Sequence, residues 1–321
     1  MGEWTAADII IYLFIQGMAI GSLYAMIALG LVLIYRTSDV LNFSHDKMGM
    51  ISAFVAYVLM TDHMPKIIAW CRGASLLSFL GDGVIMGLAL AAVLALTFCF
   101  AFLFGVITEF FFLRRAKNPS HIGYIVITIG LWLAFDGAAS WIFGTEYLSM
   151  PAPLADFSVY HLGKVPVGQL DLIIFAATSV LIVSLFIFFQ YTNIGIAMRA
   201  TFENRTAARL MGIRTRRIFS ITWGIGAVLG AMAGILTAAR SDLSNTMLFT
   251  PFVKSFSAAV LGGLTSIPGA IVGGWIMGVA ENFFGWYISM KLKTTFAFLV
   301  ILAVLLVRPS GLLVRHHQKK V

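Results

Sequence analysis

The sequence predicts an all-α polytopic membrane protein that forms one domain over residues 1–321, with about 8 to 9 transmembrane or half-membrane helices. Of its residues, 60% are hydrophobic and only 11% are charged, whereas a soluble domain carries about 25% charged residues. A helix that crosses the hydrocarbon layer needs roughly 20 apolar residues, and apolar runs of that length recur from end to end. The composition therefore excludes an ordinary soluble domain.

Charged residues, Pro and Gly separate the apolar runs from one another. We expect spans at residues 9–34, 40–60, 84–112, 122–143, 170–189, 218–239, 252–264, 270–288 and 294–307. Small residues recur at every fourth position within several spans, which lets helix backbones approach closely in lipid. Examples are Gly17, Gly21 and Ala25, then Gly226, Gly230 and Gly234, then Gly274 and Gly278. A compact helix bundle is therefore expected.

The basic residues set the expected orientation. With the N-terminus outside and the C-terminus in the cytoplasm, the inside segments hold twice as many Lys and Arg residues as the outside segments. The net charge of +8 then reflects topology and anionic lipid rather than nucleic acid. Residues 61–83 and 144–169 are expected to be extracellular cap loops. The first contains an amphipathic helix at residues 66–80, and the second is either a small cap with an alternating stretch at 157–162 or a plain loop.

The inside segment at residues 191–217 is the most informative part of the chain. It carries six arginines and the core of a short helix. One face of this helix is apolar, with Ala207, Leu210 and Met211, and Arg205 and Arg209 share another face. Gly212 can cap the end of this helix. A helix this short is marginal alone, so it should dock onto something. It either rests on lipid headgroups or is a coupling helix that fits a groove on a cytoplasmic motor.

The chain has no G-x-x-x-x-G-K-[ST] loop that would hold nucleotide phosphates. We therefore expect any ATPase to be a separate chain, with ATP and magnesium bound by that partner and no cofactor bound by this one. No covalent chemistry of its own is expected, so the chain is not predicted to be an enzyme.

A polar stretch joins the first two predicted spans. A helix that enters the membrane there begins with Asn42, Ser44, His45, Asp46 and Lys47. Ionisable groups within a span cost about 2.5–3.5 kcal/mol each at its centre, so they usually face a partner or a water-filled path. The alternative is that Asp46 and Lys47 lie at the lipid headgroups.

The later spans contain a second interruption. Gly262 and Gly263 break the segment at residues 252–274, and short or broken helices often mark the substrate site of a transporter. Among isolated polar residues, Glu281 is assigned to the path, and Asp136 either lines it or bonds to a neighbouring helix. Glu109, near the inside end of a span, is expected to snorkel toward water.

Four stretches, in order, resemble the branched-chain amino acid permeases of ATP-binding cassette importers, and specifically the shorter H-type subunit. They are residues 21–35 (GSLYAMIALGLVLIY), 40–45 (VLNFSH), 195–212 and 260–274 (VLGGLTSIPGAIVGG). The resemblance implies an alternating-access permease in the cell inner membrane. It also implies a second, M-type permease subunit, two cytoplasmic ATPase subunits and an extracytoplasmic substrate-binding protein.

The resemblance and the residue patterns together give two groups of candidate site residues. The ATPase-coupling group is Gly195, Arg199, Ala200, Asn204, Arg205, Ala208, Arg209, Leu210, Met211 and Gly212. The substrate-path group is Tyr24, Asn42, Ser44, His45, Asp46, Gly262, Gly263, Glu281 and Asn282. No catalytic and no metal-binding residue is predicted.

Two positions depart from the family pattern, and they affect the expected solute. Asp46 and Thr265 stand where the family usually has Gly. The expected cargo is a branched-chain or other hydrophobic amino acid, or a related amide, and the sequence does not choose among them. One rival is an ion-coupled secondary transporter, in which Asp46, Asp136 or Glu281 would bind the coupling ion. An intramembrane hydrolase lacks a nucleophile that spacing would pair with His45.

Overall fold

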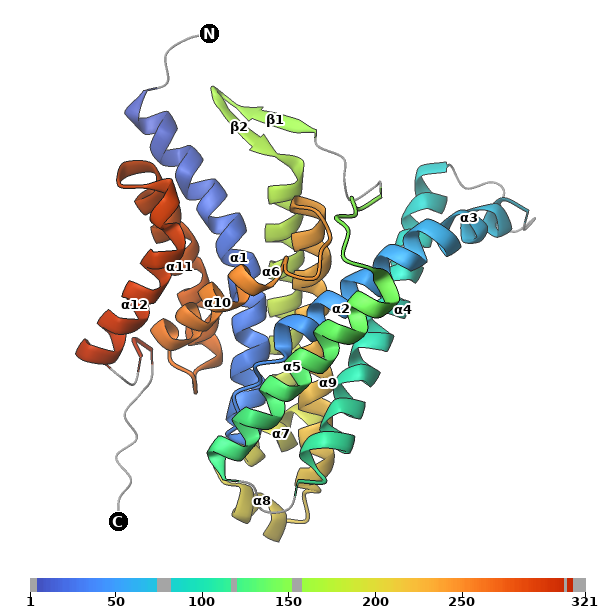
Figure 1. Cartoon of the computed structure of the whole chain (residues 1–321), viewed down its shortest axis with the longest axis vertical. Coiled ribbons are helices and arrows are strands. Elements are labelled where there is room, and N and C mark those ends of the chain that lie inside the picture. The colour runs from blue at the N-terminus through green and yellow to red at the C-terminus, as the bar shows by residue number, and fades with distance from the viewer. Residues whose placement is uncertain (1–4, 74–81, 117–119, 152–157, 309–310, 314–321) are drawn as a thin grey trace.

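The computed structural model describes residues 5–73, 82–116, 120–151, 158–308 and 311–313, and it is a bundle of helices (Figure 1). Among these residues, seven helical stretches are long and apolar enough to cross a membrane. Their helices are α1 (Ala6–Ser38), α4 (Asp82–Thr108), α5 (His121–Phe143), α6 (Gln169–Tyr191), α9 (Thr215–Arg240), α11 (Ile267–Tyr287) and α12 (Lys293–Val307). The predicted fold class is therefore confirmed.

Two helices inside the bundle are too short to cross a membrane alone. Helices α2 (His45–Val58) and α10 (Phe249–Gly262) have 14 residues each, or about 21 Å at 1.5 Å per residue, against a hydrocarbon core of about 30 Å. The span expected at 40–60 therefore begins later as a helix, because residues 40–44 are not helical. A π-helical turn, η1 (Leu59–His63), continues α2 into α3 (Met64–Gly73).

Small residues bring the central helices together as the sequence predicted. Helix α1 packs along α11, where a Cβ atom added to Gly21 would lie 2.8 Å from the carbonyl oxygen of Gly274. Helix α2 packs along α9, where a Cβ on Gly49 would lie 2.5 Å from the carbonyl oxygen of Gly230. A side chain at these positions would force the helices apart, so the packing depends on glycine.

The helices form two groups around α1 and α9 (Figure 1). Helices α10, α11 and α12 lie on one side of α1, whereas α2 and α4 pack against α9 and α5 packs against α2. The short 3-10 turn η3 (Met290–Leu292) joins α11 to α12. Helix α5 is attached lightly, because 17% of its apolar window is buried, against 89% for α1.

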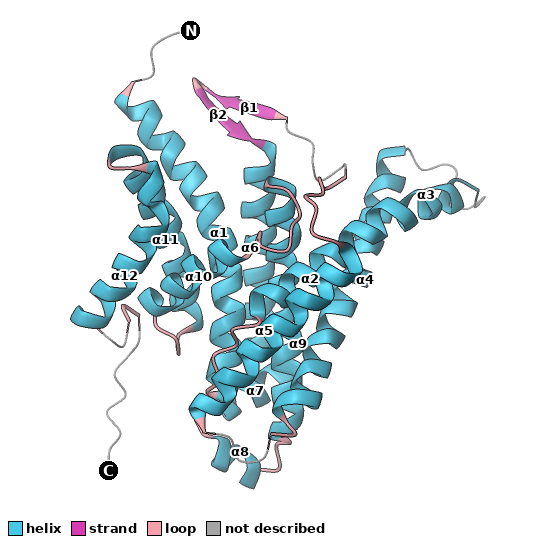
Figure 2. Cartoon of the chain, viewed as in Figure 1, coloured by secondary structure: helices cyan, strands magenta, loops and turns pink. Residues whose placement is uncertain are grey.

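The two ends of the bundle carry different structures. An antiparallel hairpin of β1 (Val159–Leu162) and β2 (Val165–Gly168) leads into α6 near the N-terminus of α1 (Figure 2). The alternating stretch predicted at 157–162 is thus a strand from residue 159 onward, and residues 152–157 lie outside the described part. Helix α3 covers residues 66–73 of the predicted interfacial helix at 66–80, and residues 74–81 also lie outside the described part. The short helices α7 (Asn193–Glu203) and α8 (Arg205–Leu210) lie at the opposite end.

Candidate functional site

The predicted coupling segment turns back sharply beneath α6. The side chain of Thr192 accepts a hydrogen bond from the Gly195 nitrogen at 3.0 Å and so caps α7. A Cβ on Gly195 would lie 2.2 Å from the Phe188 carbonyl oxygen, so only glycine permits this turn. Gly195 is buried, so its role is to permit the close turn between α6 and α7. Arg199 donates to the Gln190 side chain at 3.0 Å, and Ala200 is half-buried on the same helix.

Helix α8 forms a single exposed turn with capping at both ends. Asn204 accepts from the backbone nitrogens of Thr206 and Ala207, each at 3.0 Å, as an N-cap asparagine does. Gly212 ends the helix in the left-handed region, with φ of 83°, so the predicted cap is confirmed. Ala208 is buried and faces the bundle.

The outer tip of α8 carries two unshielded apolar side chains. Leu210 and Met211 are 84% and 83% exposed, although they lie at the polar end of the bundle, outside the apolar windows of the spanning helices. Exposed apolar groups rimmed by charged residues are typical of protein interaction sites. The tip is therefore a candidate docking point for another protein.

The arginines of α8 point back toward the bundle. Arg205 Nη2 lies 2.8 Å from Asp39 Oδ2 at the end of α1, and its guanidinium lies 5.3 Å from the Phe219 ring centre. Arg209 Nε donates to Thr215 Oγ1 at 3.0 Å. Motion of α8 would therefore be transmitted directly to the ends of α1 and α9.

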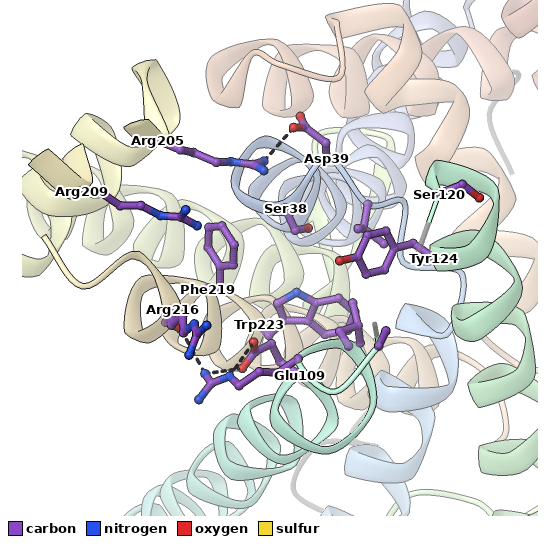
Figure 3. A pocket seen from close by; sticks show the side chains of 14 residues that line it. Ser38, Asp39, Glu109, Ser120, Tyr124, Arg205, Arg209, Arg216, Phe219 and Trp223 are labelled. Atoms are coloured by element: carbon purple, nitrogen blue, oxygen red, sulfur yellow. Dashed lines mark hydrogen bonds and ion pairs between the residues drawn. The ribbon is translucent and has the colours of Figure 1, made fainter. Parts of the chain in front are cut away.

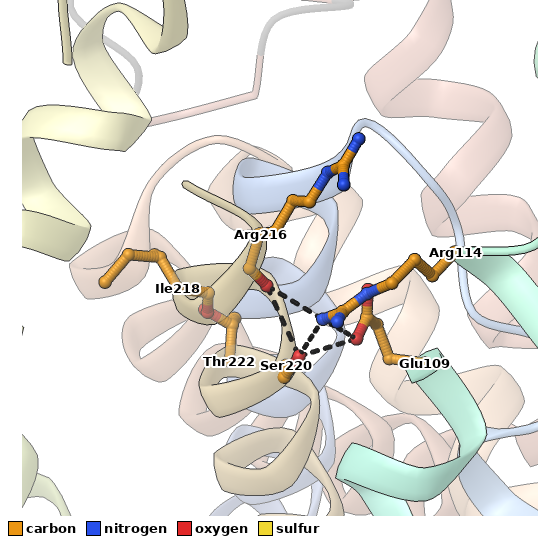
Figure 4. A network of polar contacts seen from close by, with 6 residues as sticks. All are labelled: Glu109, Arg114, Arg216, Ile218, Ser220 and Thr222. Carbon is orange, nitrogen blue, oxygen red and sulfur yellow. Dashed lines mark hydrogen bonds and ion pairs between the residues drawn. The ribbon is translucent and has the colours of Figure 1, made fainter. Parts of the chain in front are cut away.

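A second polar connection ties α4 to α9 at the same end (Figure 4). Arg114 Nη2 lies 2.9 Å from Glu109 Oε2, and Ser220 Oγ donates to that same oxygen at 2.6 Å. Glu109 is 5% exposed, so the interpretation that it snorkels into water is wrong. The carboxylate instead holds the π-helical turn η2 (Glu109–Leu113) against α9.

The first predicted break, between α1 and α2, is a buried turn. Asn42 Oδ1 accepts hydrogen bonds from the Ser44 nitrogen at 3.1 Å and from its hydroxyl at 2.7 Å. Asn42, Ser44 and His45 are each at most 1% exposed. The His45 ring packs so closely against α1 that a Cβ on Gly30 would lie 2.5 Å from Nε2. Its ring nitrogens have no hydrogen-bond partner among the described residues.

The residues that follow form a charged cluster between α2 and α5. Lys47 Nζ lies 2.6 Å from Asp136 Oδ1 and donates to the Asn245 carbonyl oxygen at 2.7 Å. Trp132 Nε1 donates to Asp46 Oδ2 at 3.0 Å. Asp46 and Lys47 are each 2% exposed, so the alternative that they lie at headgroups is wrong. We refer to Asp46, Lys47, Trp132 and Asp136 as the α2–α5 cluster.

A separate cluster lies where α1, α10 and α11 meet. Glu281 accepts from Lys254 Nζ at 2.6 Å and from the Tyr24 hydroxyl at 2.8 Å. Next to it, Asn282 donates to the Leu13 carbonyl oxygen at 3.2 Å and accepts from Lys293 at 3.0 Å. We refer to Tyr24, Lys254 and Glu281 as the α1–α10–α11 cluster.

Sequence reasoning missed Lys254 as a site residue, although it lies within the span expected at 252–264. The structure places Lys254 within α10, where it is 7% exposed. The signal available was Glu281 itself, since a carboxylate inside a span usually has a basic partner. Trp132 and Asn245 carried no comparable signal.

The second predicted break is confirmed at the end of α10. Helix α10 ends at Gly262, Gly263 has φ of 102°, and α11 begins at Ile267. A Cβ on Gly262 would lie within 2 Å of the Gly269 carbonyl oxygen, so the two arms of the hairpin are in backbone contact. Gly262 and Gly263 thus serve close packing, and Thr265 is exposed at the turn.

Residues 13–305 match the model of a known family, described as the branched-chain amino acid transport system permease component. The chain belongs to this family. It is 30% identical to the high-affinity branched-chain amino acid transport system permease protein LivH of Escherichia coli, over 95% of this chain and 96% of that protein. It is also 30% identical to BraD of Pseudomonas aeruginosa, over 96% of each chain.

A similar relative is known from an archaeon. The probable branched-chain amino acid transport permease protein LivH of Methanocaldococcus jannaschii is 26% identical over 91% of this chain and 88% of that protein. The chain is therefore a multi-pass membrane protein of a permease family, as its composition and spans also indicate. The rival of an ion-coupled secondary transporter is not favoured by these relatives.

Proposed function

We propose that this chain is the H-type permease subunit of an ATP-binding cassette importer in the cell inner membrane. It would pair with a second, M-type permease subunit and rest on two cytoplasmic ATPase subunits that bind ATP and magnesium. An extracytoplasmic binding protein would deliver a branched-chain or other hydrophobic amino acid, or a related amide. The solute would cross by alternating access, with no covalent chemistry on this chain.

The tip of α8 is the observation that carries this proposal. Leu210 and Met211 are presented to the outside, while Arg205 anchors the same helix to Asp39 at 2.8 Å and Ala208 is buried beneath it. A short helix that is firmly tied to the spanning helices, yet exposes apolar side chains, can pass a push from a partner into the bundle. This arrangement supports a coupling helix rather than a helix resting passively on lipid, and a coupling helix would lie at the cytoplasmic end of the bundle.

The two polar clusters support a path for a small solute near the broken helices. Each cluster includes residues of a short helix, α2 or α10, and each contains one buried lysine. In both clusters a lysine neutralises a carboxylate. Paired carboxylates suit a solute carried without a coupling ion better than an ion-driven carrier.

The direct test is co-purification of the tagged chain from its host membrane. We expect a second permease, an ATPase and ATPase activity that a hydrophobic amino acid stimulates in the presence of the binding protein. Uphill transport by the isolated chain in liposomes, driven by a proton or sodium gradient, would contradict the proposal.

Arg209→Glu sharpens this test. The variant should fold, because Arg209 is exposed and its one described hydrogen bond is to Thr215, but it should recover less ATPase. Arg308→Glu is the matched control, because Arg308 is an exposed arginine at the end of α12, outside residues 191–217. Equal ATPase recovery with both variants would remove Arg209 from the coupling role.

A further inference from the structure

A cavity of about 380 Å³ lies behind α8, at the end of the bundle opposite the hairpin (Figure 3). Its wall is built from the end of α1, the turn after α4, the start of α5, and helices α8 and α9. Arg205 and Arg209 extend from α8 toward the end of α1 and Phe219, with Tyr124 and the indole of Trp223 on the other side. Five segments that are distant in sequence therefore meet around one space.

The cavity has an excess of positive charge. Four arginines and two carboxylates line it, which leaves two formal positive charges without a counter-charge in the wall. Arg205 is paired with Asp39 and Arg114 with Glu109. Arg209 and Arg216 have no carboxylate partner among the described residues, so the excess belongs to them.

Neutral hydrogen-bond donors are also left unused. Trp223 is fully buried, and its Nε1 has no hydrogen-bond partner in the described structure. A buried donor without a hydrogen-bond partner destabilises the protein, so a ligand that reaches it would relieve that cost. Figure 3 shows the Tyr124 hydroxyl directed into the same space, and no hydrogen bond of that hydroxyl is found among the described residues. Donors thus predominate over free acceptors.

We propose that this cavity binds a phosphate group, carried either by an anionic phospholipid or by a soluble anion. A phosphate oxygen accepts hydrogen bonds from several directions, and arginine pairs with phosphate through two parallel donors. Arg209 and Arg216 supply the charge, and Trp223 and Tyr124 supply the neutral donors. The space holds a phosphate with an attached organic group, for which Phe219 and Val40 offer an apolar wall.

A bound phosphate would add to the polar contacts that Arg205 and Arg209 already make with the ends of α1 and α9. It would link α8, which carries the exposed tip, to Trp223 in α9 and Tyr124 in α5. The site lies behind the tip, so a ligand there would stiffen α8 from the bundle side. The proposal needs only this chain, and a failure to recover an ATPase leaves its test intact.

The test measures phosphate binding directly. The chain, with whatever partners co-purify, is placed in nanodiscs of neutral phosphatidylcholine and dialysed against radiolabelled inorganic phosphate at fixed ionic strength. Arg216→Gln and Trp223→Phe each remove a donor and keep most of the side-chain shape. Losing a hydrogen bond to a charged group costs about 1.5–3 kcal/mol, so each should raise the Kd about tenfold or more.

Arg308→Gln is the matched control, because Arg308 is exposed at the end of α12, away from α8. It should bind phosphate as the wild type does. The ATPase content of each sample is measured as well, so that phosphate held by its nucleotide sites can be subtracted. Should Trp223→Phe fail to fold, Tyr124→Phe replaces it.

A second arm distinguishes the source of the phosphate. The chain is purified from native membranes, and its retained anionic phospholipid is counted by native mass spectrometry. Binding of inorganic phosphate that the variants weaken supports a soluble anion, and phospholipid lost in the variants supports a lipid headgroup. If wild type, Arg216→Gln and Trp223→Phe agree in both arms, the proposal is overturned.

Discussion

Two lysine–carboxylate pairs lie inside the bundle, and they differ in how completely the protein encloses them. The side chains of Lys254 and Glu281 are 9% and 5% exposed, and the Tyr24 hydroxyl donates to the same carboxylate. The side chain of Lys47 is 2% exposed, but that of its partner Asp136 is 36% exposed. One pair is sealed between tightly packed helices, whereas the other opens on one side through α5.

The packing around each pair accounts for this difference. Helices α1 and α11 meet through glycines, so a Cβ on Gly278 would lie 2.3 Å from the Gly21 nitrogen. Helix α5 has no such backbone approach at its Gly130, where an added Cβ would meet nothing within 4 Å, and it meets the bundle through side chains, including a hydrogen bond from Thr128 to the Leu41 carbonyl oxygen at 3.2 Å. The sealed pair is therefore the more tightly enclosed of the two, and the open pair is the better candidate for a part that moves or meets solute.

The largest effect is expected at the sealed pair. Lys254→Ala leaves the Glu281 carboxylate buried without its cation, and breaking a buried pair in this way costs about 3–5 kcal/mol. The free energy of unfolding in mixed detergent micelles measures the loss. The triple variant Lys254→Met, Glu281→Met and Tyr24→Phe removes all three polar groups and should recover most of it. A triple variant as unstable as Lys254→Ala would show that the cost is packing rather than charge.

A smaller loss is expected at the open pair. In Asp136→Ala, Lys47 keeps its bond to the Asn245 carbonyl oxygen and its position 4.7 Å from the Trp132 ring centre. Because Asp136 is also partly exposed, we expect a cost of about 1–2 kcal/mol, below the buried-pair range. The same unfolding measurement compares the two sites. A loss as large as that of Lys254→Ala would mean that the α2–α5 cluster is as rigid as the sealed one.

The parts of the site that sequence predicted are those whose signal is local. The glycine spacing in α1 and α11 and the Gly212 cap depend on neighbouring residues along one helix, and the structure confirms them. The two helix interruptions were also visible, because the polar stretch around Asn42 and the glycine pair at Gly262 separate apolar runs. The resemblance to the family followed from four stretches of sequence that occur along the chain in the expected order.

The partners inside each cluster were not predictable in the same way. Lys47 and Asp136 are 89 residues apart, and Lys47 and Asn245 are 198 apart. No periodicity within one helix connects such positions, because the register between helices decides which side chains meet. Sequence analysis joined Asp46 and Glu281 in one path, whereas the structure places them in two clusters with no hydrogen bond between them among the described residues.

Asp46 tests whether the open cluster influences the solute. One of its oxygens accepts from Trp132, and the other has no hydrogen-bond partner among the described residues. Asp46→Gly introduces the residue that the resemblance leads us to expect at this position, and it should change stability by about 1 kcal/mol or less, because the net value of one hydrogen bond is of that size. The readout is which amino acids stimulate ATPase activity in the reconstituted complex. An unchanged ranking of solutes would exclude Asp46 from solute selection.

The smallest change in stability is expected at the tip of α8. Leu210→Ala with Met211→Ala removes two exposed side chains, and surface substitutions of this kind are usually within about 0.5 kcal/mol. Burying an apolar side chain of this size contributes about 1.5–3 kcal/mol, so the double variant should weaken ATPase binding about tenfold or more. Leu306→Ala is the control, because Leu306 is 76% exposed on α12 and should leave binding unchanged. Wild-type ATPase binding by the double variant would mean that α8 is not the contact. The proposed transmission of motion from an ATPase through α8 into the bundle would then have no support.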